Sequence, residues 1–162
     1  MLFCVSEDMN ESTRLANWDD GGNHAFKRDC IKANPSRGEI AVTRAGHYVF
    51  YSHLAVCRCA AHTGFRQRVY RRPAGGGDPQ ILLEDNSSGR SEGRGQGCVG
   101  EPTFASDLFA VVHLEDGDSI WIEAKPATAV YRPNSASFFG FYQLSFFWVV
   151  TRGLGGTGGV QS

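Results

Sequence analysis

The sequence predicts an all-β domain built as a sandwich or jelly roll. Short runs rich in β-branched and aromatic residues recur along the chain between turn residues, and amphipathic helical periodicity is hard to find. A chain of 162 residues fits one domain with a sizeable core. Many short strands without a helix are typical of two packed sheets.

The expected strands follow one another with recognisable turn signals. In chain order they are residues 2–6, 24–28, 39–43, 46–56, 66–72, 80–84, 104–114, 119–124 and 137–144. Residues 73–79 form a loop bracketed by prolines, and residues 85–100 have the Gly/Ser/Arg composition of a long surface loop. Residues 115–118 (EDGD) indicate a tight hairpin in which Gly117 takes a positive φ.

The segment "GHYVFYSHLAV", residues 46–56, departs from the usual pattern of a half-buried strand. Side chains alternate between the two faces of a strand, so Tyr48 and Phe50 share one face while Val49 and Tyr51 share the other. Both faces are therefore apolar.

Two further segments repeat this excess of apolar side chains. Phe139 and Phe141 oppose Phe138, Tyr142 and Leu144 in residues 137–144, and Leu108, Ala110, Val112 and Leu114 oppose Phe109 and Val111 in residues 104–114. If the three strands share a sheet, something must cover its outer face, and a second copy of the chain is the economical cover. Strands inside a closed barrel would show the same pattern, and periodicity does not separate the two.

Charge and composition exclude several function classes. The net charge is -1 with both signs spread along the chain, so no nucleic acid partner is expected. No membrane-spanning run or signal peptide is found, which predicts a trimmed ectodomain or another export route. Five cysteines and two glycosylation sequons, at Asn10 and Asn86, favour an extracellular setting.

No catalytic or metal-binding motif is complete. Serine, histidine and aspartate lack any nucleophile elbow around them, so no enzyme activity is expected. Cys57, Cys59 and His62 have ligand types that zinc prefers, but a fourth ligand with metal spacing is missing. We therefore expect neither metal nor cofactor.

Four motifs resemble the tumour necrosis factor (TNF) ligand superfamily. They are "RAGHYVFYSHLAV" for its third core strand, "LFAVVHLEDGDSIWIEA" for its long strand and Gly-Asp hairpin, "SFFGFYQL" for its closing strand and "ANWDDGGNHAF" for its tryptophan segment. The last is most similar to Fas ligand and its nearer relatives. The resemblance implies a TNF homology domain over residues 1–144, followed by an extension, residues 145–162, that we expect to be flexible.

The resemblance also implies a TNF-like jelly-roll β-sandwich of two antiparallel sheets that assembles as a homotrimer. The residues expected to face neighbouring subunits are Val49, Tyr51, Phe109, Val111, Phe138, Tyr142 and Leu144. One departure stands out: where relatives often carry an aromatic residue followed two positions later by glycine, this chain has Asp107 and then Phe109.

By the same resemblance, the chain is expected to be a cytokine outside the cell, secreted or shed from a type II membrane protein, with membrane contact only through a stalk that this chain lacks. It would cluster cysteine-rich receptors of the TNF receptor family, with contacts from Arg71, Arg72, Asp78 and Tyr131. A disulfide between Cys59 and Cys98 is implied, with Cys57 as a competing partner. The alternative is a complement-type globular recognition head, which shares the jelly-roll trimer.

Overall fold

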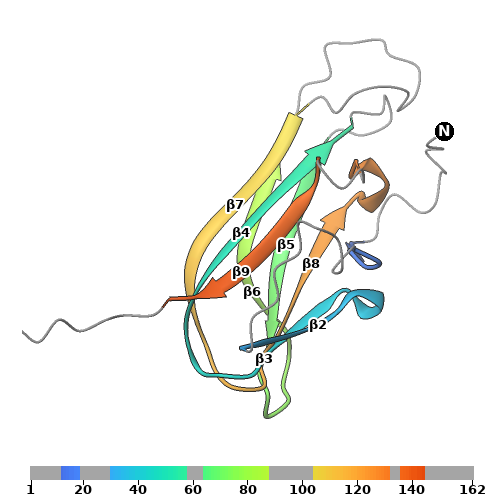
Figure 1. Ribbon diagram of the computed structural model, residues 1–162. Coiled ribbons are helices and arrows are strands. Elements are labelled where there is room, and N and C mark those ends of the chain that lie inside the picture. Colours follow the sequence, from blue (N-terminus) through green and yellow to red (C-terminus); the bar gives the residue numbers. More distant parts are fainter. Residues whose placement is uncertain (1–11, 19–29, 58–63, 88–103, 132–135, 145–162) are drawn as a thin grey trace, which may run out of the picture.

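The computed structural model describes residues 12–18, 30–57, 64–87, 104–131 and 136–144 (Figure 1). This part of the chain forms nine strands and two single-turn 3-10 helices, arranged as two antiparallel sheets packed face to face. The all-β prediction and the two-sheet sandwich are confirmed.

The larger sheet has the strand order β2–β3–β8–β5–β6. The short strand β1 also pairs with β8 and belongs to the same sheet. Its strands are β1 (Thr13–Arg14), β2 (Ile31–Asn34), β3 (Glu39–Val42), β5 (Phe65–Arg72), β6 (Gln80–Ser87) and β8 (Ser119–Lys125). The two 3-10 helices, η1 (Pro35–Arg37) and η2 (Ala127–Ala129), follow β2 and β8.

The smaller sheet has the order β7–β4–β9, and Figure 1 shows these three strands side by side in one layer. Its strands are β4 (Gly46–Val56), β7 (Phe104–Leu114) and β9 (Phe138–Gln143). Because β4 is the central strand, its outward residues Val49, Tyr51 and His53 each have a neighbour on both sides. The three segments with two apolar faces thus share one sheet, which is the condition under which the sequence pattern calls for a cover.

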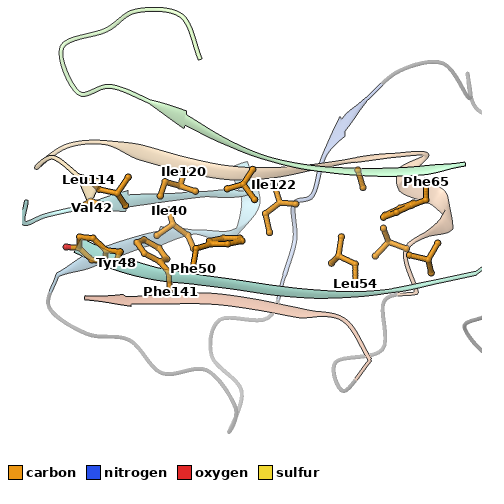
Figure 2. Close-up of a cluster of buried hydrophobic side chains, with 14 of the residues drawn as sticks. Ile40, Val42, Tyr48, Phe50, Leu54, Phe65, Leu114, Ile120, Ile122 and Phe141 are labelled. Carbon is orange, nitrogen blue, oxygen red and sulfur yellow. The ribbon is translucent and has the colours of Figure 1, made fainter. Parts of the chain in front are cut away.

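The core lies between the two sheets (Figure 2). From β4, Tyr48, Phe50 and Leu54 are each no more than 2 % exposed; Tyr48 and Phe50 lie on the side of the isoleucines of β3 and β8, and Leu54 lies on the side of Phe65. The Tyr48 hydroxyl donates to the Arg44 carbonyl at 2.6 Å. Burial, with a smaller contribution from the Cys30 thiol, raises the pKa of Tyr48 to about 12.

A buried polar network links the sheets toward one end of the sandwich. Gln67 of β5 donates through Nε2 to Ser52 Oγ of β4. Ser106 Oγ of β7 lies 2.9 Å from Gln67 Oε1 and 2.5 Å from Asp85 Oδ2 of β6. Polar groups are tolerated in an apolar core because they bond one another.

Some strand boundaries differ from the expectation. Residues 46–56 and 104–114 are strands with the bounds predicted, whereas β6 continues to Ser87, so residues 85–87 belong to a strand rather than to the predicted loop of residues 85–100. Their pairing with β5 provides the hydrogen bonds that extend it. Strands β1 and β2 were not predicted, and the expected strands at residues 2–6 and 24–28 lie outside the described residues.

Candidate functional site

The outward face of β7, β4 and β9 is an exposed apolar surface, which we call the outer face of the small sheet. Of the six large hydrophobic side chains that are exposed in the described part of the chain, five lie here: Tyr51, Phe109, Val111, Phe138 and Tyr142. The sixth, Ile81, lies on β6. Phe109 is the most exposed, at 72 %.

Strand register makes this surface continuous. Tyr51 of β4 lies opposite Phe109 of β7 on one side and Gly140 of β9 on the other. Val49, two residues earlier, lies between Val111 and Tyr142 in the same way. Directly opposed residues on one face of an antiparallel pair are close enough for their side chains to touch.

The seven residues expected to face another subunit fall into three groups. Five of them are the exposed residues named above. Val49 points the same way but is only 4 % exposed, because it is in the central strand between Val111 and Tyr142. Leu144, just past β9, is half-buried, and its N–H donates to the His47 carbonyl at 2.8 Å.

Gly140 allows Tyr51 to lie flat across β9. A Cβ at position 140 would come within 2.6 Å of the Tyr51 hydroxyl oxygen and 2.8 Å of its ring carbon Cζ, closer than real Cβ contacts. The glycine in "SFFGFYQL" therefore makes room for the tyrosine ring. Any larger side chain there would push the ring away from the sheet.

One polar pair, His53 and Asp107, interrupts the apolar surface. His53 Nδ1 lies 2.6 Å from Asp107 Oδ1, directly across β4 and β7. The imidazole also stacks on Phe138 of β9, with ring centroids 5.2 Å apart and an interplanar angle of 19°. Together with Tyr51 and Phe109, these side chains line a shallow pocket of about 300 Å³.

The loop of residues 73–79 is tied to the hairpin at residues 115–118 by one buried carboxylate. Asp118, only 1 % exposed, accepts hydrogen bonds from the backbone N–H groups of Ala74 (3.2 Å) and Glu115 (2.8 Å). The same carboxylate lies 2.7 Å from Arg71 Nε, an ion pair. Sequence reasoning missed this role because Arg71 and Ala74 are far from Asp118 in the chain.

Of the predicted receptor contacts, Arg71 and Arg72 already have partners within the chain. Arg71 pairs with Asp118, as described. Arg72 holds its guanidinium 5.0 Å from the centroid of the Trp121 ring and 4.0 Å from Glu39. Asp78 is exposed in its loop. Tyr131 is half-buried, with its carbonyl accepting from Ser137 Oγ at 2.5 Å.

Trp121 itself lies on the outward face of the larger sheet and is only 3 % exposed. Arg14 places its guanidinium 4.2 Å from the ring centroid, and Tyr70 stacks on the ring at 5.4 Å. The indole N–H donates to Glu123 at 3.0 Å. We call this group, with Arg72, the Trp121 cluster.

The remaining predicted sites are mostly outside the described residues. Cys59, Cys98 and Asn10 lie there, so the Cys59–Cys98 bridge stays a prediction, while Cys57 is buried at the end of β4. Asn86 is exposed on β6, and its side chain donates to Glu84, whose pKa is lowered first by Arg68 and then by this contact.

The described residues also offer little for metal binding or membrane crossing. They contain no cluster of three or more His, Cys, Asp or Glu side chains suited to a metal ion. None of the helices in these segments has the length and apolar character that crossing a bilayer requires.

Comparisons with known proteins connect this sandwich to one family. A sequence model of the TNF (Tumour Necrosis Factor) family matches residues 16–144. Among curated proteins, none matches the sequence significantly. The fold is similar to crystal structures of murine APRIL at pH 8.5 (TM-score 0.56, 20 % identity, 73 % of this chain and 78 % of that one) and at pH 5.0 (0.57, 18 %, 73 % and 80 %).

Proposed function

Because the chain belongs to the TNF family, we propose that it works as a homotrimeric cytokine that binds and clusters receptors of the TNF receptor family. The jelly-roll sandwich provides the scaffold. Signalling then depends on geometry, since each groove between neighbouring subunits would hold one elongated receptor and one trimer would gather three. The proposed domain is residues 1–144, with residues 145–162 as an extension.

The observation that carries this proposal is the outer face of the small sheet. Soluble monomers seldom leave large contiguous apolar patches exposed, and such patches usually mark interaction sites. At about 25 cal/mol per Å², covering the exposed part of an aromatic side chain on this face contributes roughly 2 to 4 kcal/mol. Four exposed aromatic residues on one face, Tyr51, Phe109, Phe138 and Tyr142, therefore supply enough to offset the cost of association.

The loops beside the subunit groove are the proposed receptor contacts. Asp78 is exposed there, Arg72 is exposed although it also contacts Trp121 and Glu39, and Tyr131 lies after the second 3-10 helix. We assign Arg71 a different task, which is to hold the loop of residues 73–79 in place through Asp118. The setting we propose is extracellular, and the action is that of a ligand rather than an enzyme.

Trp18, in the tryptophan segment, packs within the subunit. Its ring meets Phe139 edge to face, with centroids 4.8 Å apart, and lies against the core. We therefore propose that the indole of Trp18 supports the subunit from within rather than contacting a receptor.

Two measurements test the proposal. Multi-angle light scattering at micromolar concentration should give the mass of three chains, and a monomer would overturn it. A pulldown against a panel of TNF-receptor ectodomains should then capture at least one. Binding only to pattern targets of collagen-linked recognition heads would favour the complement-type alternative instead.

A matched pair of variants makes the receptor test specific. Asp78→Lys reverses the charge of an exposed side chain in the proposed contact loop, while Lys32→Glu makes a comparable reversal on β2, outside the loops proposed to contact receptor. We expect both to stay trimeric and only the first to weaken capture by tenfold or more.

A further inference from the structure

The His53–Asp107 pair lies within the surface proposed to be buried between subunits, so its charge state bears on assembly. In the single chain the two side chains are 36 % and 68 % exposed, and water solvates them. Covering the face with a second copy would remove that water. A desolvated carboxylate costs several kcal/mol unless a counter-charge accompanies it.

Protonation of His53 decides whether that counter-charge exists. With a protonated imidazole, the 2.6 Å contact is an ion pair with no net charge. With a neutral imidazole, the same contact is a hydrogen bond to a carboxylate, and each subunit brings one uncompensated negative charge into the interface. A trimer would collect three such charges.

Apart from the Tyr51 phenol, which lines the same pocket, the other titratable groups on this face are far from the pair. On β7, His113 lies six residues from Asp107, about 20 Å along the strand, and contacts Glu115 at 3.5 Å. His47 of β4 lies opposite His113, and Tyr142 of β9 lies opposite Val49. Among the described residues of β4, β7 and β9, Asp107 is therefore the charged group that faces His53 directly.

We propose that the His53–Asp107 pair couples subunit assembly to proton uptake, so that the assembled form is favoured at mildly acidic pH and weakened as the pH rises. This inference rests on the proposed function, because it requires that the outer face of the small sheet be buried between copies. Assembly raises the proton affinity of His53, since the imidazolium gains an unscreened carboxylate partner. The stabilisation is complete while His53 is protonated in both states and is lost when the assembled form releases the proton.

Sedimentation of the full chain across a dilution series, between pH 5.5 and 8.5, tests this coupling. The dissociation constant should rise at least tenfold between pH 6 and pH 8. His53→Gln keeps a hydrogen-bond donor but does not titrate, so its dissociation constant should stay flat over this range. Asp107→Asn removes the buried carboxylate, so at pH 8 it should assemble more tightly than the wild type. Below pH 6 it should assemble more weakly, because the imidazolium of His53 then lacks its counter-charge.

A control variant on the same face locates the effect. His113→Gln, at the far end of the surface, should keep the wild-type dependence on pH. If His53→Gln keeps the dependence or His113→Gln removes it, the assignment to His53 is overturned. A wild-type trimer whose dissociation constant does not change with pH overturns the coupling alone, whereas a chain that is monomeric at every pH overturns the proposed function as well.

Discussion

The two outward faces of the sandwich differ in how far their large aromatic side chains are exposed to solvent. On the larger sheet, Trp121 is 3 % exposed because Arg14, Arg72 and Tyr70 lie over or against its ring. On the smaller sheet, Phe109 is 72 % exposed in an equally outward position. Long arginine side chains can cover apolar surface while their charged ends stay in water.

On the larger sheet, the chain's own side chains cover the outward aromatic residue Trp121. The outer face of the small sheet offers no arginine or lysine on its three strands for that purpose. Its apolar side chains are the ones that we propose another subunit covers. The contrast is therefore between a face covered within one chain and a face that stays exposed in the single chain.

A carboxylate placed on each face of β4 in turn tests which face is needed for folding and which for assembly. Phe50→Asp puts an unpaired charge in the core and removes a 2 % exposed aromatic residue, so it should cost more than about 5 kcal/mol and prevent folding. Tyr51→Asp, one residue on, should leave a folded or partly folded monomer that no longer clusters receptor. Circular dichroism and light scattering distinguish the two. The same behaviour from both variants would show that the face assignment is wrong.

A second, smaller effect on stability is expected at Asp118, which ties the hairpin before β8 to β5 and its loop. Asp118→Ala removes the acceptor of two backbone N–H groups and the partner of Arg71, so it should lower the free energy of unfolding by about 3 kcal/mol. Urea titration measures this change. Asp116→Ala, an exposed neighbour in the same hairpin, should stay within about 0.5 kcal/mol of the wild type.

On the inner face of β4, the raised pKa of Tyr48 predicts that the free energy of unfolding falls at alkaline pH. The folded-state pKa of Tyr48, about 12, is above its ordinary value of 10.0, so its contribution is complete below pH 10 and is lost as the pH rises toward 12. By pH 11 the wild type should lose about 1 kcal/mol for this reason. Tyr48→Phe should lack that component in urea titrations at pH 7 and pH 11. An equal loss in both proteins would contradict the prediction.

The Trp121 cluster predicts the smallest effect. Arg72→Ala removes one of two guanidinium groups over the ring and should cost about 0.5 to 1 kcal/mol, because cation–π contacts at partly exposed sites are weak. Lys32→Ala, an exposed position on β2, is the matched control and should cost less. If Arg72→Ala caused the chain to self-associate through the larger sheet, that would strengthen the contrast between the two faces.

The strands were best predicted where a long run of β-branched and aromatic residues lies between turn residues. Residues 46–56 and 104–114 are each eleven residues long, and their bounds and faces are as expected. Strand β1 has two residues and β2 reads "IKAN", which is too short and too weakly apolar to signal a strand. The fold class and the outer apolar face could thus be predicted from local pattern.

Contacts between distant residues could not be predicted in the same way. The His53–Asp107 pair joins positions 54 residues apart and exists because β4 and β7 pair in one particular register. Asp118 meets Arg71 and Ala74 because β5 and β8 are neighbours in the larger sheet. A shift of one residue in either pairing would turn these side chains to the opposite face, so the contacts depend on register rather than on composition.

The ring of Tyr51, lying over Gly140, has a consequence for the kinetics of association. A tyrosine side chain that adopts its bound rotamer only on contact loses conformational entropy on binding. Only those encounters between molecules in which it has this rotamer then lead to a complex. Here the neighbouring strand already restricts that rotamer in the isolated chain, so the entropy is lost during folding. This part of the surface is therefore preorganised, and in the proposed trimer the subunits would dock as rigid bodies without waiting for this side chain to rearrange.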